Sequence, residues 1–348
     1  MSSAPGSTPE LSQTLPHLPP DVERREESVA SAVQPNAVIH TDGLTKHFGD
    51  EVAVQDVSLD IERGVIFGFI GPSGSGKTTT VRLLTGIAQP SSGALEVFGV
   101  RPDTFAPSLR KRIGYMPQLF VLYPDLSVWE NMNFVASLYG LGFRRGKRMR
   151  ELLDFVELTE HRHKLARKLS GGMQRRLSLA ATLIHDPDVL FLDEPTAGID
   201  PVLRAKFWDY FRELRSRGRT LFVTTQYVGE AAYCDRIGVM RDGRLLAVET
   251  PTGLRRLALG GEIVDVRLRS HLTGEQEMRL RTLPFVREDL RILGHLHLRV
   301  VVEDASAAIP QLLRWFEENQ IGVEAVDEYQ PPFDDVFVEL IRREDVHA

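Results

Sequence analysis

Residues 71–78 form the pattern G-x-x-x-x-G-K-[ST], which is typical of a loop that surrounds phosphate groups. The segment consists of Gly71, Pro72, Ser73, Gly74, Ser75, Gly76, Lys77 and Thr78. Its glycines allow backbone N–H groups to approach a phosphate, and the positive end of a following helix favours negative charge. Lys77 would contact the β- and γ-phosphates of a nucleotide, and Thr78 would offer its hydroxyl to Mg²⁺. The alternative is a chance Gly/Ser turn.

The flanking residues predict the strand and the helix that such a loop requires. Val65 to Ile70 is an apolar run suited to a buried strand, and a helix is predicted over residues 79–84. Thr79 directly follows the loop and is included in the predicted nucleotide site. A match to the loop pattern in this setting makes the chance turn the weaker interpretation.

Two adjacent carboxylates follow a second apolar run. Val189 to Leu192 is continuously apolar, as in a strand of a parallel sheet, and Asp193 and Glu194 come next. Ligands of such sheets lie beyond the carboxyl ends of the strands. Asp193 would therefore hold Mg²⁺, and Glu194 would polarise the attacking water. The alternative for an isolated Asp-Glu pair is a solvated turn.

A second helix start with an affinity for anions is predicted at Ser170, Gly171 and Gly172. Ser170 is a natural N-cap, and a helix is predicted from Met173 to His185.

Two further residues could serve the same site. Phe48 precedes the loop and could stack on an adenine ring, or it could be a core residue at a strand end. Gln118 ends the predicted strand over residues 113–118 and could contact Mg²⁺ or the attacking water. A glutamine in that position could also be merely solvated.

Length and composition limit the class of protein. The 348 residues suggest two domains, and the 42% hydrophobic and 26% charged fractions are ordinary for a soluble globular chain. A net charge of −6 gives no electrostatic reason to expect nucleic-acid binding. The single cysteine, Cys234, excludes an internal disulfide. No apolar stretch reaches the length of a bilayer and no secretory signal is visible, so we expect another chain to hold this one at any membrane.

The pattern along the chain predicts three regions. Residues 1–36 are rich in Ser, Pro and Glu and are expected to form a disordered tail, in which residues 29–33 could be a short helix. Residues 37–260 contain the motifs above, with antiparallel strands at the start and mostly helix over residues 126–166. Residues 261–348 are predicted to be a small, self-contained α+β domain.

Three local signals are weaker. Ser127 and Glu130 have the spacing of a capping box at a helix start. The basic run over residues 143–148 could be a solvated connection, or it could contact lipid headgroups or an acidic partner. His295 and His297 lie on one face of a predicted strand, where they could bind a metal or be solvated.

Taken together, the motifs over residues 38–254 resemble the ATP-binding subunit of an ABC transporter. The resemblance rests on the P-loop Gly71–Thr78, the Q-loop residue Gln118, the signature Leu169-Ser170-Gly171-Gly172-Met173, the Walker B strand Val189–Asp193 with Glu194, the D-loop Ala197-Gly198-Ile199-Asp200 and the aromatic residue Phe48. It implies an α/β fold, a P-loop NTPase core with an antiparallel β subdomain and a helical subdomain. The C-terminal α+β domain would be an addition to this core.

The resemblance also implies partners, cofactors and a cellular place. ATP and Mg²⁺ would be bound, and each ATP would lie between the P-loop of one subunit and Ser170-Gly171-Gly172 of a second, head-to-tail copy or homologous subunit. Residues 119–139 would contact an integral membrane permease, which would hold the chain peripherally at the cytoplasmic face of the membrane. The segments Cys234-Asp235-Arg236-Ile237 and Pro332-Phe333-Asp334-Asp335-Val336-Phe337 are similar to exporters of the drug, lipid or polysaccharide type.

One position departs from the family pattern. A histidine that contacts the γ-phosphate usually follows the strand 221–225, whereas this chain has Gln226. Glutamine can donate a hydrogen bond but carries no charge near neutral pH. We therefore expect Gln226 to sense the phosphate and Glu194 to polarise the water.

Two other functions compete with an ATPase that drives transport. A soluble ABC ATPase could act on ribosomes or DNA, but such relatives usually have two cassettes or a long insertion, and this chain has one cassette and an acidic balance. A regulatory subunit could close on ATP and hydrolyse it poorly, and Gln226 is the reason to consider it.

Overall fold

The computed structural model describes residues 37–142, 145–294 and 296–347. The predicted tail over residues 1–36, part of the basic run, and His295 lie outside the described residues. Within the described ranges, no helix combines the length and the apolar character needed to cross a bilayer.

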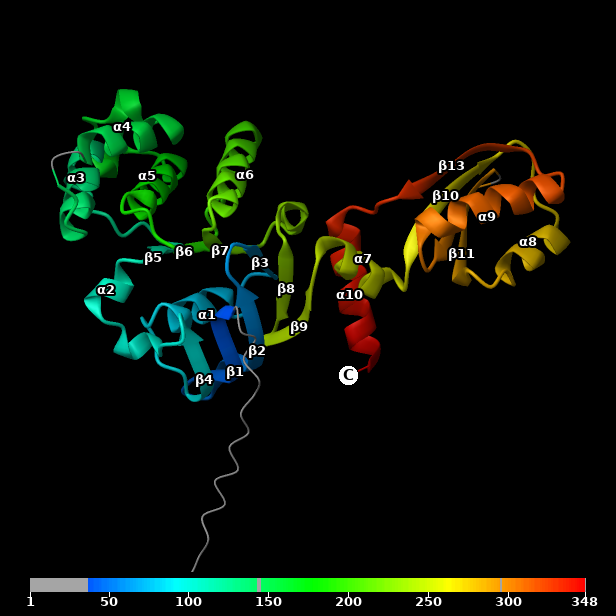
Figure 1. The fold of residues 1–348 in the computed structure, drawn as a ribbon, viewed down its shortest axis with the longest axis horizontal. Helices are drawn as coiled ribbons and strands as arrows, with labels where there is room; N and C mark the ends of the chain where they lie inside the picture. Colours follow the sequence, from blue (N-terminus) through cyan, green and yellow to red (C-terminus); the bar gives the residue numbers. More distant parts are fainter. Residues whose placement is uncertain (1–36, 143–144, 295, 348) are drawn as a thin grey trace, which may run out of the picture. The chain divides into compact units, whose positions relative to one another are not determined.

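A six-stranded sheet with the order β5-β6-β7-β3-β8-β9 positions the predicted site (Figure 1). Its strands are β3 (Ile66–Ile70), β5 (Ile113–Met116), β6 (Val189–Asp193), β7 (Thr220–Thr225), β8 (Arg236–Arg241) and β9 (Arg244–Glu249). Neighbouring strands are parallel except for β8 and β9, which form an antiparallel hairpin. β3, β6 and β7 are buried at every position, which explains the predominantly apolar sequence of β3 and β6 and the apolar run Leu221–Val223 in β7.

The two faces of this sheet pack against different layers. Leu190 and Leu192 of β6 belong to a core shared with the helices, and Phe191 between them belongs to a second core. The second core includes an antiparallel sheet of order β2-β1-β4, formed by β1 (Ala37–Phe48), β2 (Glu51–Glu62) and β4 (Ser92–Val97). Because side chains alternate along a strand, the strands of the six-stranded sheet contribute side chains to both cores. The antiparallel strands predicted at the start of this region are confirmed.

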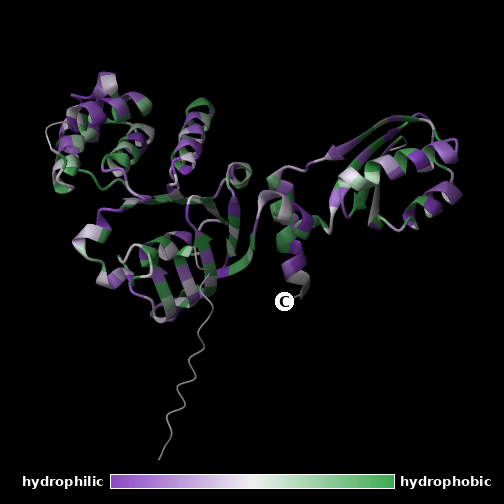
Figure 2. Cartoon of the chain, in the orientation of Figure 1, coloured by the Kyte–Doolittle hydropathy of each residue, from purple (hydrophilic) through white to green (hydrophobic). Residues whose placement is uncertain are grey.

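The helices that follow the P-loop are α1 (Lys77–Leu84), α2 (Pro107–Arg110), α3 (Val128–Leu138), α4 (Arg145–Phe155), α5 (Gly171–Leu183), α6 (Pro201–Ser216) and α7 (Pro251–Leu259). Short 3₁₀ turns are η1 (Pro102–Thr104), η2 (Thr159–His161), η3 (Ala166–Lys168) and η4 (Val228–Tyr233). The predicted capping box of α3 is confirmed, because Glu130 N donates to Ser127 Oγ at 3.2 Å and Ser127 N donates to Glu130 Oε2 at 2.8 Å. Figure 2 shows hydrophobic and hydrophilic segments alternating along the helices, as expected where one helix face covers a core.

The C-terminal region contains a third sheet, of order β11-β12-β10-β13. Its elements are β10 (Glu262–Leu268), α8 (Gly274–Arg281), β11 (Val286–Gly294), β12 (His297–Val302), α9 (Ala305–Glu318) and β13 (Val323–Tyr329). Val264, Val266, Leu312 and Phe316 are part of its own hydrophobic core. His297 Nε2 donates a hydrogen bond to Asp265 Oδ2 at 2.7 Å. The described residues include no cluster of His, Cys, Asp and Glu side chains suited to a metal.

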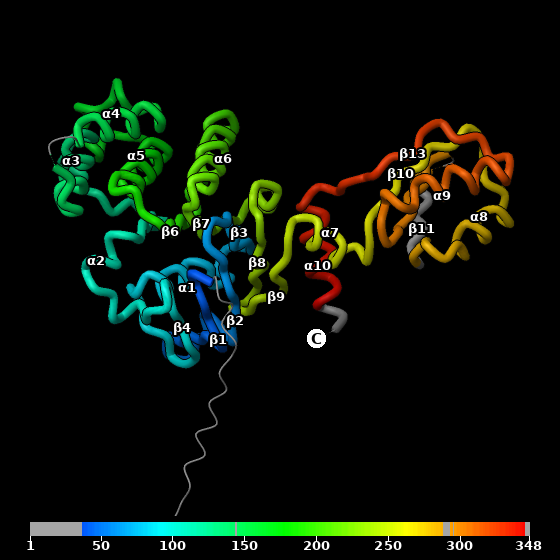
Figure 3. The backbone as a smooth tube through the Cα atoms, viewed as in Figure 1, coloured from blue at the N-terminus to red at the C-terminus, as the bar shows by residue number. Residues whose placement is uncertain are grey.

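The last helix, α10 (Phe333–His347), corrects the expectation that residues 261–348 are self-contained. Phe333, Val336 and Leu340 belong to the core that the six-stranded sheet shares with the helices, together with Leu254 of α7. The guanidinium of Arg255 lies 4.0 Å from the centre of the Phe333 ring. Figure 3 shows α10 beside α7, in agreement with these contacts.

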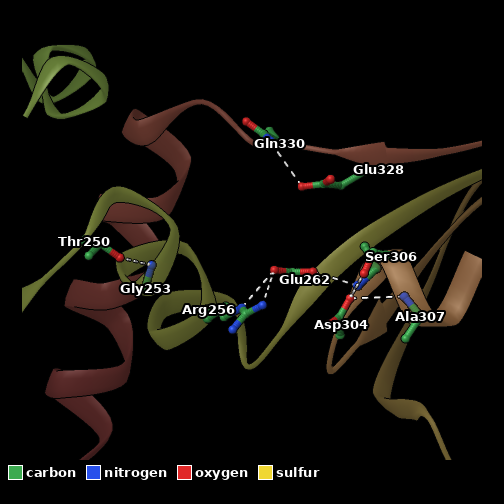
Figure 4. Close-up of polar contacts among 10 residues, drawn as sticks. Thr250, Gly253, Arg256, Glu262, Asp304, Ser306, Ala307, Glu328 and Gln330 are labelled. Carbon is green, nitrogen blue, oxygen red and sulfur yellow. Dashed lines mark hydrogen bonds and ion pairs between the residues drawn. The ribbon is translucent and has the colours of Figure 1, made fainter. Parts of the chain in front are cut away.

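A polar network lies where the chain passes from α7 to β10 (Figure 4). Arg256 donates from Nε and Nη2 to Glu262 Oε1 at 2.9 and 2.6 Å, and Glu262 Oε2 accepts from Ala305 N at 2.7 Å. Asp304 caps α9 by accepting a hydrogen bond from Ala307 N, and its Oδ1 also accepts one from the hydroxyl of Ser306. Both bonds lower the pKa of the Asp304 carboxyl group, and the bond from Ser306 has the larger effect. Glu262 thus joins the end of α7 to the start of α9.

Candidate nucleotide-binding site

The P-loop connects β3 to α1 as predicted, and two of its glycines are required by close packing. Gly76 is the N-cap of α1 with a φ of 99°, and a Cβ atom there would lie 2.3 Å from the carbonyl oxygen of Ala53. A Cβ atom on Gly71 would lie 2.1 Å from the carbonyl oxygen of Met240. Any larger residue would push the loop away from β8 and from the start of β2.

Lys77 lies buried inside the loop. Its Nζ donates to the carbonyl oxygens of Gly71 and Pro72, at 2.7 Å in each case. Burial lowers the pKa of Lys77, while the nearby Glu194 and Asp193 raise it. The ammonium group is therefore positioned between the phosphate-binding backbone and the two carboxylates.

Asp193, at the carboxyl end of β6, is fully buried and contacts the P-loop. Its Oδ1 accepts hydrogen bonds from Thr78 Oγ1 at 3.2 Å and from Thr224 Oγ1 at 2.5 Å. Its Oδ2 has no hydrogen-bond partner among the residues that the structure describes. A buried carboxylate oxygen without a partner beside a threonine hydroxyl fits a Mg²⁺ site, because Mg²⁺ takes few carboxylates and retains water ligands.

Glu194 turns sharply away from the end of β6. Its φ of 51° is in the left-handed region, and its N–H is held by the carbonyl oxygen and the hydroxyl of Thr224 at 3.1 and 3.0 Å. The side chain lines the same pocket as Lys77 and Thr78. A strained backbone at this point separates the direction of Glu194 from that of Asp193, which is consistent with different tasks for the two carboxylates.

A pocket of about 540 Å³ joins most of the predicted residues. Its lining consists of Phe48, Glu51, Val52, Ala53, Ser73, Gly74, Gly76, Lys77, Thr78, Thr79, Gln118, Glu194, Asp242 and Gly243. The side chain of Phe48 is 51% exposed, and Lys46 Nζ lies 5.0 Å from the centre of its ring, so Phe48 is not a core residue. Gln118 faces the pocket together with Thr78, as a shared role toward Mg²⁺ requires.

Sequence reasoning missed the contribution of two further segments to this pocket. Glu51, Val52 and Ala53 are the first residues of β2, and Asp242 and Gly243 form the β8–β9 turn. Gly243 N donates to Ser75 O at 3.2 Å, which attaches this turn to the P-loop. Asp242-Gly243 was identifiable as a hairpin turn, but only the pairing of β3 with β8 brings it to the P-loop.

Ser170, Gly171, Gly172 and Gln226 do not line the pocket. Ser170 caps α5 as predicted and accepts from Met173 N at 3.3 Å, although the helix begins at Gly171 and not at Met173. Gln226 is exposed directly after β7.

Arg175 provides a link from α5 to the pocket that the sequence did not reveal. Its Nη1 donates to Gln118 O at 2.6 Å. Burial lowers the pKa of Arg175, and Glu194 and Asp193 raise it. α5, which Ser170 caps, is thus connected to Gln118 of the same chain.

Comparison with known proteins agrees with this arrangement. The family model described as ABC transporter matches residues 54–197. The chain is 39% identical, over 88% of its length and 96% of the relative, to the daunorubicin resistance ATP-binding protein DrrA3 of Streptomyces coeruleorubidus. It is also 39% identical, over 75% of its length and 90% of the relative, to the Nod factor export ATP-binding protein I of Cupriavidus metallidurans.

A solved structure with a similar fold is the dimeric post-hydrolysis state of the ATP-binding cassette MJ0796 bound to ADP and Pi. Its TM-score to this chain is 0.57, with 27% sequence identity over 61% of this chain and 98% of the cassette. Nearly the whole cassette is therefore matched, while more than a third of this chain has no counterpart in it.

Proposed function

This chain belongs to the ATP-binding subunits of ABC transporters, and from that membership we propose that it hydrolyses ATP to drive export through a separate membrane-spanning protein. One observation carries the proposal. Lys77 of the P-loop lies with Glu194 in one pocket, and Asp193 contacts Thr78 beside them. A phosphate-binding lysine, a buried carboxylate and a second carboxylate that faces the pocket are the parts that phosphoryl transfer to water needs.

Each of these side chains has a task in the proposed reaction. Lys77 and the backbone N–H groups of the P-loop bind the β- and γ-phosphates and stabilise charge that develops on them. Glu194 accepts a hydrogen bond from the attacking water and orients it toward the γ-phosphate. Thr78, Asp193 and Gln118 would hold Mg²⁺, which when bound neutralises charge on the phosphate oxygens.

The site requires a second copy for completion, which we propose to be a head-to-tail partner. Ser170, Gly171 and Gly172 start α5, where the N–H groups have no preceding helical turn to pair with, yet they lie outside the pocket that contains the P-loop of the same chain. A partner would place its Ser170 on the γ-phosphate of this chain, and Gln226 would contact the same phosphate. The dimeric cassette with 27% identity supports such an assembly.

A permease is proposed to dock on residues 119–139, next to Gln118. Leu119, Val121 and Tyr123 are 71%, 66% and 51% exposed, which is unusual for apolar side chains close together in one loop. Contact with a membrane protein would place the chain peripherally at the cytoplasmic face of the membrane. The names of the two relatives refer to drug resistance and to Nod factor export, and they support export as the direction.

The decisive variant is Glu194→Gln in the purified full chain with ATP and Mg²⁺. We expect steady-state hydrolysis to fall by about 100-fold or more while ATP binding persists, because the amide keeps the shape of the carboxylate but is a poor base. ATP should then convert the variant from monomer to dimer on size-exclusion chromatography. Glu157→Gln changes an exposed glutamate that lies outside the pocket and serves as the control.

Unchanged turnover in Glu194→Gln would contradict its assignment as the group that polarises water. Co-purification from membranes tests the transport function. A polytopic membrane protein is the expected partner, and capture of ribosomes or DNA in its place would contradict the proposal.

A further inference from the structure

A buried carboxylate joins the two loops that follow β6 and β7. Glu230 lies in η4, after Gln226, and its side chain is 3% exposed. Its Oε1 accepts a hydrogen bond from Thr196 Oγ1 at 2.7 Å. Thr196 is fully buried and follows Glu194 in the loop that leads to α6. One buried hydrogen bond therefore connects the loop after the catalytic carboxylate with the segment that begins at Gln226.

Arg204 of α6 balances the charge of Glu230 and contacts both loops. Its Nε lies 3.8 Å from Glu230 Oε1, and its Nη2 donates to the carbonyl oxygen of Ile199 at 3.3 Å. Its guanidinium carbon lies 4.6 Å from the centre of the Tyr227 ring. A buried carboxylate needs such a cation, because a charge that has lost its hydration and has no partner strongly destabilises the fold.

The cluster of Thr196, Arg204, Tyr227 and Glu230 is incompletely hydrogen-bonded. Glu230 Oε2 and Arg204 Nε have no hydrogen-bond partner in the part of the chain that the structure describes. Buried polar atoms are nearly always paired in folded proteins. A small shift of Arg204 would convert the 3.8 Å ion pair into a hydrogen bond, so the same residues have a second arrangement available to them.

We propose that Glu230 is a positioning residue that couples the loop over residues 195–200 to the segment over residues 226–230. The inference rests on the proposed function, in which Gln226 contacts the γ-phosphate and residues 197–200 belong to the D-loop. Glu230 acts on neither ligand nor water directly. When phosphate contact moves Gln226, the hydrogen bond to Thr196 and the contacts of Arg204 move the second loop with it.

A merely structural hydrogen bond would affect only stability, and a matched pair of threonine variants separates the two roles. Thr196→Val removes the hydroxyl from the cluster and keeps the side-chain shape. Thr182→Val makes the same change in α5, where a buried hydroxyl donates to Ser178 O at 2.9 Å and contacts neither loop. Both variants are made in the full chain, and the thermal unfolding of each is measured.

We expect Thr196→Val to lower kcat for ATP hydrolysis by about tenfold while the Kd for ATP stays within about twofold, since the P-loop is untouched. Thr182→Val should retain the kcat of the wild type, and Thr196→Ser should restore it. Glu230→Gln keeps the acceptor but not the charge that holds Arg204, so it should also lower kcat. Its effect should not add to that of Thr196→Val in the double variant.

Equal kcat in Thr196→Val and Thr182→Val would overturn the inference, as would effects of Thr196→Val and Glu230→Gln that simply multiply. A fall in kcat that tracks the melting temperature across all variants would also overturn it. Failure of the proposed function gives a different result, because the wild-type chain itself would then hydrolyse no ATP.

Discussion

His185 is a half-buried histidine outside the nucleotide pocket, at a junction of three elements. Its ring stacks on Tyr139, which follows α3, with 3.6 Å between ring centres. Its Nε2 lies 3.1 Å from the carbonyl oxygen of Ile113 in β5, and its Nδ1 has no hydrogen-bond partner within the described ranges. Burial lowers the pKa of His185, against the opposing effects of the Ile113 carbonyl and Asp186.

This lowered pKa predicts a pH dependence of stability. Below about pH 6.5 the unfolded chain protonates His185 while the folded chain does not, so the free energy of unfolding should fall as the pH falls. At higher pH both states are neutral and the effect disappears. Urea unfolding at pH 7.5 and 5.5 measures the difference, which should be smaller in His185→Phe.

The control for this prediction is His161→Gln, which removes an exposed histidine. It should leave the difference between the two pH values unchanged. An equal reduction in both variants would show that the pH dependence arises elsewhere in the chain.

The residues of the nucleotide site differ in how far sequence could assign them. Lys77, Thr78, Asp193 and Glu194 were predictable because each lies within a short contiguous motif, next to an apolar strand that fixes its direction. Asp242 and Glu51 were not, because their place depends on how distant strands pair. Arg175 belongs to a helix whose N-terminus is expected to contact the nucleotide of a second subunit. Its contact with Gln118 of the same chain therefore had no signal in the sequence.

At the scale of elements, α10 belongs to the ATPase core and should contribute to its stability. Val336 of α10 is fully buried in that core, whereas Val338 of the same helix is 48% exposed. Val336→Ala should lower the free energy of unfolding by about 1–3 kcal/mol, since it removes two buried methyl groups and leaves a cavity. Val338→Ala should change it by less than about 0.5 kcal/mol.

Chemical unfolding followed by circular dichroism and by tryptophan fluorescence, to which Trp208 in the same core as Val336 contributes, measures both variants. Equal stabilities would mean that α10 does not stabilise the ATPase core. The pair is matched because both substitutions are made in one helix and remove the same atoms.

Elements near the motifs were easier to predict than those at the chain's end. The strand and helix beside the P-loop, the α3 capping box and the β8–β9 turn have strong local signals. α7 also carries such a signal, a Thr250 cap followed by Pro251. The sequence analysis predicts no helix over α10, whose packing partner α7 is distant in the sequence.

At the scale of the whole molecule, the proposed dimer makes a prediction about which residues meet across copies. A chain with Ser170→Cys and a second chain with Ser73→Cys should form a disulfide with each other under mild oxidation in the presence of ATP. The Glu194→Gln background keeps the dimer closed. Non-reducing electrophoresis detects the product, and neither variant alone should form it efficiently.

The native thiol should not interfere with this experiment. Cys234 is buried, and burial raises the pKa of its thiol, so little reactive thiolate forms. A disulfide between two Ser170→Cys copies in place of the mixed product would mean that the two subunits do not pack head to tail.

The contacts between α7 and α10 give the C-terminal sheet the character of an insert that is anchored at both ends. The chain leaves the ATPase core after α7, forms β10 to β13, and returns to the same core through α10. A protease that cuts one peptide bond within residues 269–272 would therefore release no fragment, because both products remain attached through a shared hydrophobic core. For the same reason, shortening the chain at residue 330 would remove α10 and uncover Leu254. Joining the end of α7 to the start of α10 with a short linker would instead excise the insert and leave that core covered.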